Sequence, residues 1–151
     1  MGDAEVVDPV TRAVIDLGGI ASAAEILERR CSRDLIKLVA EYGDIRRIRH
    51  GWYASPDVPE DSLRAWKAGG RLTCISAAAH LGLWPHVVEG IHVRVAANSA
   101  RVERSPGVVV HWSRAPLTGT RLAVSVDEAL KTIRRCQPPD VFHAIRRAAN
   151  R

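Results

Sequence analysis

The sequence predicts an α+β protein with an N-terminal helical part that ends in a β-hairpin. A small α/β part with a short antiparallel sheet and C-terminal helices is expected to follow. Segment 22–42 has the caps and apolar spacing of two short helices. Segment 45–53 has a His-Gly turn beside residues that favour strands. Apolar runs near 91–95 and 108–112 indicate two further strands.

The first predicted helix begins at Asp8-Pro9, where the aspartate is the N-cap and the proline takes the first helical position. Gly18-Gly19 end it, and Ile20 is expected to pack beneath the next helix. Its apolar edge consists of residues at helical spacing, namely Val10, Val14 and Leu17. This helix adds apolar side chains to the core, because two short helices and a hairpin bury too little apolar surface alone.

The next two helices each begin at a serine. Ser22 and Glu25 have the spacing of a capping box, in which the hydroxyl accepts from a backbone N–H and the carboxylate reaches back. Ser32 is the next N-cap, so the connection between the helices is tight. Gly43 ends the second helix as a C′ residue. The residues of that helix expected to face the core are Leu35, Ile36, Val39 and Ala40.

A β-hairpin is predicted directly after these helices. His50-Gly51 provides the turn, and Trp52-Tyr53 favour the second strand and are expected in the core rather than stacked on bases. Ile45 and Ile48 lie three residues apart, so the first strand departs from strict alternation.

Helix, turn, helix and hairpin in this order predict a winged helix-turn-helix, a fold that docks on double-stranded DNA. Segment 29–54 carries 7 Lys+Arg against 3 Asp+Glu, a net charge of +4 that suits a phosphate backbone. From the second helix, the residues expected at the major groove are Ser32, Arg33 and Lys37. From the hairpin, those expected at phosphates or the minor groove are Arg46, Arg47, Arg49 and His50.

The residues GGIASAAEILERRCSRDLIKLVAEYGDIRRIRHGWYASP resemble the N-terminal winged helix of AbiEi-type antitoxins and transcriptional regulators. LTCISAAAHLGLW, at 72–84, resembles the segment that follows in many of these proteins. The resemblance covers most of the chain and is strongest up to Trp84. The motif positions that carry it are Gly18, Gly19, Ser32, Gly43, Gly51 and Tyr53.

The resemblance implies a DNA-binding transcriptional regulator, an antitoxin that represses its own promoter. Its expected partners are operator DNA, a cognate toxin protein and a second copy of the chain. The same N-terminal half occurs in front of Vsr-like endonuclease domains, so the alternative is the DNA-recognition part of such an endonuclease without its nuclease domain. A winged-helix module that contacts protein is a third function. On the second helix the negative charges of Asp34 and Glu41 offset the positive charges of Arg33 and Lys37. Relatives often carry several arginines on this helix. Here the electrostatic attraction for DNA is therefore expected to come mainly from the hairpin.

The predicted boundaries assign 1–56 to the winged helix-turn-helix and 57–70 to a connector helix. The remaining segment, 71–151, is the small α/β domain for dimerisation, DNA contact or partner contact. The Pro- and acid-rich segment 55–62 marks the boundary between the parts.

Within 71–151, a helix over 73–81 precedes two strands that are expected to pair antiparallel. A polar loop over 98–107, with Pro106-Gly107 as turn residues, joins them. In the first of these strands, polar residues alternate with apolar ones, which predicts a half-buried strand. Segment 121–124 is a short third strand. Ser125 and Glu128 predict another capping box, and Pro138-Pro139 separate the helix it opens from a last helix over 140–150.

The composition is that of a globular protein, with 46% hydrophobic and 26% charged residues. No apolar run approaches the roughly 20 residues needed to cross a bilayer, and the acidic N-terminus lacks a signal region, so a cytoplasmic location without membrane contact is predicted. Three widely spaced cysteines fit a reducing compartment. The net charge of +5 divides into −1 for residues 1–56 and +6 for residues 57–151.

The sequence predicts no catalytic site, no metal and no cofactor. Its six histidines and three cysteines lack the short spacings of zinc-binding motifs, and phosphate-loop and serine-hydrolase motifs are missing. Asp127-Glu128 with Lys131 comes nearest to a nuclease-like group, but helix capping explains it. Cys74 would need a histidine partner to act as a nucleophile, and nothing in the sequence places one nearby. The chain is expected to bind rather than to catalyse.

Overall fold

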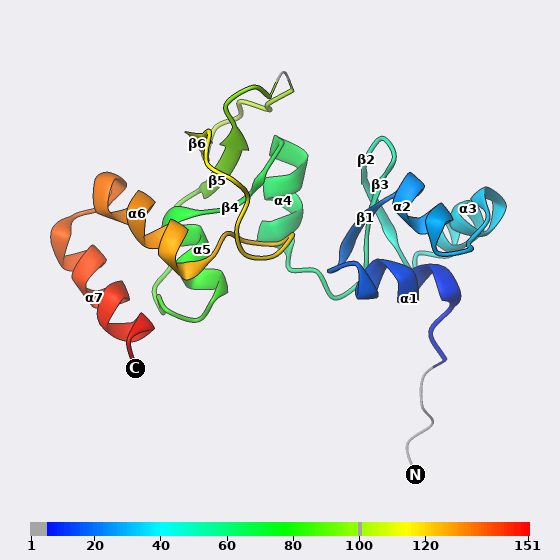
Figure 1. Ribbon diagram of the computed structural model, residues 1–151, viewed down its shortest axis with the longest axis horizontal. Helices are drawn as coiled ribbons and strands as arrows, with labels where there is room; N and C mark the ends of the chain where they lie inside the picture. The colour runs from blue at the N-terminus through cyan, green and yellow to red at the C-terminus, as the bar shows by residue number, and fades with distance from the viewer. Residues whose placement is uncertain (1–5, 100) are drawn as a thin grey trace, which may run out of the picture. The chain divides into compact units, whose positions relative to one another are not determined.

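The computed structural model describes residues 6–99 and 101–151. Within these residues there are seven helices and two three-stranded sheets, which confirms the α+β class. The chain divides into two compact units, Met1–Val58 (unit 1) and Pro59–Arg151 (unit 2), each with its own apolar core. Figure 1 shows the elements of both units.

Unit 1 consists of three helices beside a small antiparallel sheet with strand order β1-β3-β2. Its elements are α1 Pro9–Asp16, β1 Ile20–Ser22, α2 Ala23–Glu28, α3 Arg33–Glu41, β2 Arg46–Arg49 and β3 Trp52–Ala54. The three helices begin where the sequence predicts, because the Asp8, Ser22 and Ser32 side chains each accept a hydrogen bond from a backbone N–H of the first turn. At Ser22 both halves of the capping box are present.

Strand β1 was not predicted from the sequence. Ile20 was expected to pack beneath a helix, and it is fully buried, but it lies in β1 and pairs with Ala54 of β3. Three residues are too few to show an alternation of apolar and polar side chains in the sequence. The strand is recognised only by its pairing with the hairpin.

The hairpin explains the spacing of Ile45 and Ile48. The register of β2 against β3 shifts between Arg47 and Arg49, as in a β-bulge. Because the bulge adds one residue, both isoleucines are buried although they lie three apart. The same extra residue leaves Arg46 and Arg47 both exposed on the strand.

Replacing Ser22 by alanine should lower the free energy of unfolding of unit 1 by about 1 kcal/mol. The hydroxyl accepts from the Glu25 N–H at 3.1 Å, and its loss leaves that donor without its capping partner. Chemical denaturation of the full chain, followed by signals of unit 1, measures the change. Glu28→Ala, at an exposed position of the same helix, is the control and should have a much smaller effect. An unchanged unfolding midpoint for the serine variant would contradict this role.

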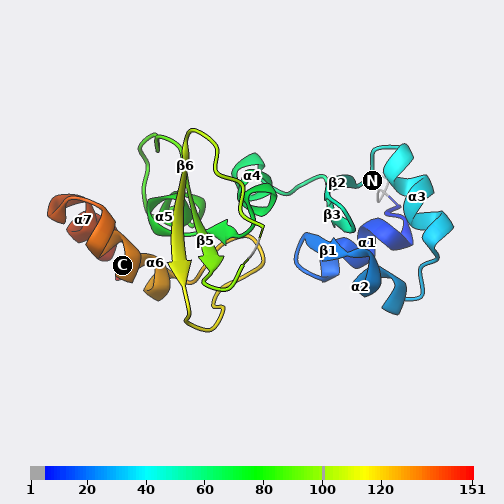
Figure 2. The same ribbon diagram turned by 90° about the horizontal axis from the view of Figure 1, so that it is seen from above.

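Unit 2 places a three-stranded sheet, ordered β4-β5-β6, among four helices. Its elements are α4 Glu60–Ala68, β4 Arg71–Leu72, α5 Cys74–His80, β5 Ile91–Ala96, β6 Val108–Ser113, α6 Val126–Cys136 and α7 Pro139–Ala149. The predicted connector helix is α4, and it belongs to unit 2 because Ala65 and Ala68 pack in the same core as β5 and α5. Figure 2 shows β5 and β6 side by side with α5 behind them.

The prediction that the strands near 91–95 and 108–112 pair antiparallel is wrong. β5 pairs antiparallel with β4 but parallel with β6, from Ile91 opposite Val108 to Ala96 opposite Ser113. The connection 97–107 reaches up to about 36 Å, enough to run back along a six-residue strand of about 20 Å. On its return Glu103 donates its N–H to the Ala68 carbonyl at the end of α4. Pro106-Gly107 therefore lies beside the start of β5 rather than between two hairpin strands.

Two further details of unit 2 differ from the prediction. Segment 121–124 forms a single bridge, Leu72 with Ala123, rather than a strand. Ser125 caps α6 by accepting from the Glu128 N–H, but the Glu128 carboxylate forms an ion pair with Arg94 instead of closing a capping box. The break at Pro138-Pro139 and the final helix are as predicted.

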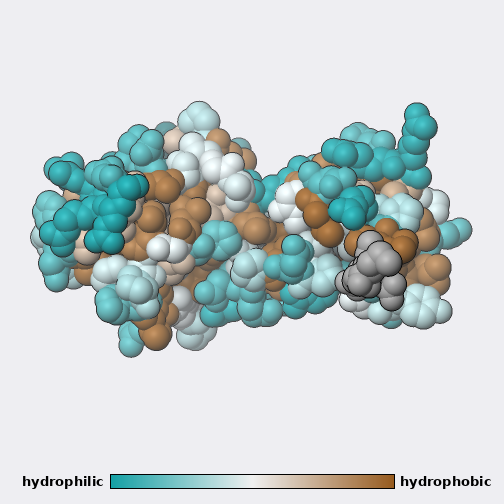
Figure 3. Space-filling model, turned by 90° about the horizontal axis from the view of Figure 1, so that it is seen from below, coloured by the Kyte–Doolittle hydropathy of each residue, from teal (hydrophilic) through white to brown (hydrophobic). Residues whose placement is uncertain are grey.

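Surface apolar side chains are found in both units. Figure 3 shows brown apolar surface among hydrophilic residues on one face. The most exposed large ones among the described residues include Leu38, Tyr42, Val87, Trp112 and Leu117. Within residues 6–99 and 101–151, every helix is too short or too polar to span a bilayer.

Candidate functional site

The predicted residues of α3 lie at its start and on its exposed side. The Ser32 hydroxyl accepts from the Leu35 N–H at 3.1 Å, so it serves as the N-cap and remains exposed. Arg33 and Lys37 are exposed one turn apart, while Ile36 and Val39 face the core. This helix therefore fixes two cations on a rigid surface.

The predicted hairpin residues form a basic strand and turn. Arg46, Arg47 and His50 are exposed, and Arg49 is half-buried. The guanidinium of Arg47 lies 2.9 Å from Nδ1 of His50, which couples the strand to the turn. Arg46 donates to the Val58 carbonyl at 3.4 Å. Three arginines within four residues give this hairpin a dense positive charge.

A shallow groove of about 460 Å³ connects α3 with the hairpin. It brings together Arg33 and Lys37 of α3 and Arg47 of β2, three of the seven residues predicted for DNA contact. Glu41 also lines it, so three cations face one carboxylate. Ser32, Arg46, Arg49 and His50 are outside its lining.

Two apolar residues on α3 were missed as candidates. Leu38 is 47% exposed and Tyr42 is 78% exposed, and their spacing of four places them on one face of the helix end. The prediction for this helix rested on the spacing of its core-facing residues alone. The available signal was that both are large apolar residues outside the core-facing spacing of the helix.

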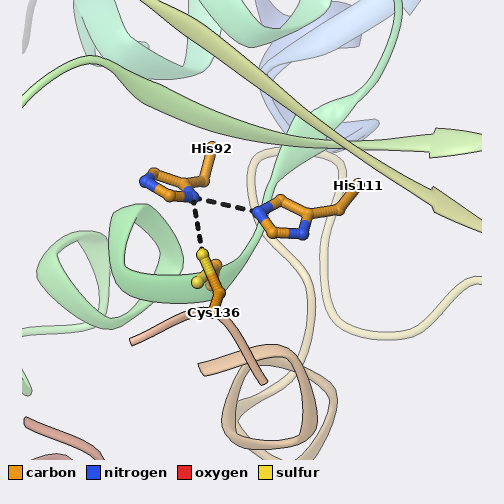
Figure 4. A group of neighbouring side chains, drawn as sticks. His92, His111 and Cys136 are labelled. Carbon is orange, nitrogen blue, oxygen red and sulfur yellow. Dashed lines mark hydrogen bonds between the residues drawn. The ribbon is translucent and has the colours of Figure 1, made fainter. Parts of the chain in front are cut away.

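A second candidate site lies in unit 2. The side chains of Cys74, His92, His111 and Cys136 each offer a donor atom, and the four donor atoms lie within 4.8 Å of one another. Nδ1 of His92 lies 3.0 Å from Nε2 of His111 and 3.8 Å from Sγ of Cys136. Figure 4 shows both histidines and Cys136 directed toward one point.

Four separate elements build this cluster. In the parallel pairing, His111 of β6 lies opposite Arg94 of β5. Because Arg94 and His92 are two residues apart on β5, they share one face of the sheet, and His111 lies on that face as well. The first turn of α5 is held to β5 because Thr73 donates to the His92 carbonyl and the His92 N–H donates to the Ser76 hydroxyl. These bonds place Cys74 beside His92, and Cys136 arrives from the last residue of α6.

Burial controls the protonation of the cluster. Burial, with repulsion from His111 as a smaller cause, lowers the pKa of His92 to about 4. Burial also lowers the pKa of His111. Both imidazoles are therefore neutral at pH 7, the form that donates a lone pair to a metal ion. Burial raises the pKa of the Cys74 thiol to about 12.

A larger groove of about 960 Å³ passes the cluster, and His111 and Cys136 form part of its wall. The buried Arg94 also lines it. Its Nε lies 3.3 Å from Oε1 of Glu128, an ion pair whose geometry falls outside that of a hydrogen bond. Asp127-Glu128 and Lys131, the nearest nuclease-like group in the sequence, also line this groove. The Glu128 carboxylate is occupied by Arg94 and the Thr118 hydroxyl.

The cysteine–histidine cluster was not predicted from the sequence, because its four residues are spread over 74–136. Zinc motifs are recognised by short spacings, and tertiary structure alone brings these residues together. Histidines on two adjacent, mainly apolar strands were the available signal. That signal needed the parallel register, which was predicted as antiparallel.

The comparisons with known proteins gave no match, neither to a protein family nor to a curated protein.

Proposed function

We propose that unit 1 is a winged helix-turn-helix that binds double-stranded DNA and that the protein is a transcriptional regulator. The element order α1-β1-α2-α3-β2-β3 and the β1-β3-β2 sheet support this proposal. In this arrangement α3 is the recognition helix and β2-β3 is the wing.

The groove shared by α3 and the wing carries the proposal. DNA docked along it would meet Arg33 and Lys37 from α3 and Arg47 from the wing. Bases read from α3 would be contacted by Ser32, Arg33 and Lys37, whereas Arg46, Arg49 and His50 would hold phosphates beside the groove. Because Asp34 and Glu41 leave α3 itself about neutral, the wing supplies most of the attraction.

The regulatory role follows from the resemblance of the sequence to AbiEi-type antitoxins. The operator would lie upstream of the protein's own gene, and a cognate toxin would be a partner. The alternative is the DNA-recognition part of a Vsr-like endonuclease.

A fluorescence-polarisation titration against the upstream DNA and a scrambled duplex distinguishes the two functions, because an autorepressor prefers its operator and a detached recognition part binds both alike. Absence of binding at low salt would contradict both.

Removing the charge of the wing should weaken binding to every duplex. If about five phosphates are neutralised, log affinity falls against log salt with a slope of about −4 to −5. Arg46→Ala with Arg47→Ala should reduce the size of that slope by about 2, whereas Lys37→Ala should weaken operator DNA more than scrambled DNA if it reads bases. Titration at several salt concentrations measures both effects.

Arg12→Ala, at an exposed position of α1, is the matched control and should leave the slope unchanged. A wing double variant that binds like the parent chain would remove the wing from the proposal.

The exposed pair on α3 favours a second function for the same helix. Leu38 and Tyr42 offer apolar area next to the basic groove, which suits contact with a protein or with a second copy of the chain. The double variant Tyr42→Ser with Leu38→Ser should then abolish association between copies of the chain, measured by analytical ultracentrifugation. This result is expected whether or not DNA binding is also lost. A protein that is monomeric before the change would contradict self-association.

A further inference from the structure

We propose that Cys74, His92, His111 and Cys136 bind a zinc ion in a tetrahedral site within unit 2. Two thiolates and two imidazoles are a ligand set that favours zinc over hard cations such as magnesium and calcium. The four donor atoms already lie within 4.8 Å of one another. Neither the proposed DNA contact nor any residue of unit 1 is required for this site.

The distances fit such a centre. With Zn–S near 2.3 Å and Zn–N near 2.0–2.1 Å, a tetrahedron separates two nitrogens by about 3.3 Å, nitrogen from sulfur by about 3.6 Å and two sulfurs by about 3.8 Å. The structure has 3.0 Å between the two nitrogens and 3.8 Å between His92 Nδ1 and Cys136 Sγ. The widest separation between two donor atoms is at most 4.8 Å. It must shorten by about 1 Å to match a tetrahedral zinc site, which side-chain rotation can achieve.

The surroundings of the cluster also suit a metal. Gln137 Nε2 approaches Cys136 Sγ at 3.5 Å, an outer contact that stabilises a thiolate. Cys74 has a φ of +54°, a left-handed conformation that is costly for a residue with a Cβ. Such conformations are enriched at functional sites, and this one lies at a fully buried ligand position.

Four protein ligands complete a tetrahedron and leave no position for substrate, so the site is structural. It would tie together the start of α5, the strands β5 and β6 and the end of α6. Cys136 and the half-buried His111 border the groove of unit 2, which gives the ion a path from solvent.

The first experiment measures metal in the full chain. The protein is purified without a polyhistidine tag, supplied with zinc sulfate, and passed over a desalting column before elemental analysis. About one zinc ion per chain is expected. Cys136→Ser and His111→Gln should each lower zinc affinity by more than about 100-fold, since loss of even an outer contact costs 10–100-fold.

Two controls make the loss specific. Cys31→Ser removes a cysteine of unit 1, and His143→Gln removes an exposed histidine of α7, and both should keep the zinc. Because Cys136 is exposed, its replacement should leave the circular dichroism of the zinc-free chain unchanged, so that lost zinc reports a lost ligand.

The second measurement identifies the ligands. X-ray absorption at the zinc edge should show two sulfur and two nitrogen neighbours, and cobalt substitution should give the visible bands of a tetrahedral thiolate site. Zinc well below one per chain, or a first shell without sulfur, would overturn the proposal. A disulfide between Cys74 and Cys136 in the untreated protein, detected by mass spectrometry after alkylation, would overturn it as well.

Discussion

Replacing Gly70 by alanine is expected to unfold unit 2 and to leave unit 1 folded. A Cβ on Gly70 would lie 1.9 Å from the Arg94 carbonyl oxygen and 2.9 Å from a Val93 methyl group. The first contact is with backbone in the centre of the sheet, so no side-chain rotation relieves it. Relief requires β4 to separate from β5, where Arg71 pairs with Arg94. We expect a loss above about 4 kcal/mol, the range reached by few single substitutions.

Hydrogen exchange measured by NMR on the full chain tests this expectation. Amides of β5 and α6 should lose protection, while amides of α3 and β3 keep theirs, because the two cores share no residues. Gly82→Ala is the matched control. Its φ is +76°, so alanine is strained by about 1–2 kcal/mol, but its Cβ meets no atom within 4 Å. Equal effects of the two substitutions would show that the clash at Gly70 is relieved in another way.

The sequence was informative where structure depends on local signals. Asp8, Ser22 and Ser32 start helices through contacts within one turn, and Gly43 and Gly51 take positive φ values at a helix end and a turn. Such features depend on neighbours in the chain, so a single sequence contains them. The seven predicted DNA-contact residues lie on α3 and the hairpin, but their binding remains a prediction.

The sequence was least informative where structure depends on distant pairing. Apolar strands near 91–95 and 108–112 are equally compatible with parallel and antiparallel pairing, and the path of 97–107 past α4 decides between them. His92 and Arg94 were expected on a solvent-facing side of β5, yet both are buried. They are covered because α6 brings Cys136 to His92 and Glu128 to Arg94.

The two proposed sites can be tested separately because they lie in different units. The DNA variants change α3 and the wing, and the zinc variants change α5, β5, β6 and α6. Loss of zinc with retained operator binding would assign the metal to the stability of unit 2 alone. Loss of both would indicate that unit 2 contributes to DNA affinity, which its net charge of +7 over residues 59–151 allows.

Replacing Glu128 by alanine is expected to cost unit 2 about 3 kcal/mol, the lower end of the cost of breaking a buried ion pair, because the Glu128 side chain is 14% exposed. Its carboxylate lies 3.3 Å from Nε of the buried Arg94 and also opposes the positive charge of Arg71. Burial and the nearby Arg94 and Arg121 lower the pKa of Arg71, while Glu128 raises it, so the carboxylate offsets repulsion among several cations. Its loss leaves the Arg94 guanidinium buried without its carboxylate, with a hydrogen bond to the Ala115 carbonyl.

Removing both charges together should restore much of this loss. Arg94→Met with Glu128→Leu replaces the pair by apolar side chains, and such exchanges are often close to neutral. The double variant should therefore be more stable than Glu128→Ala, and a double-mutant cycle from chemical denaturation gives the coupling. Asp127→Ala, an exposed acid in the same first turn of α6, is the control for the helix dipole and should cost less than about 1 kcal/mol. If Glu128→Ala matches that control, the pair contributes to the surface of the groove rather than to the stability of unit 2.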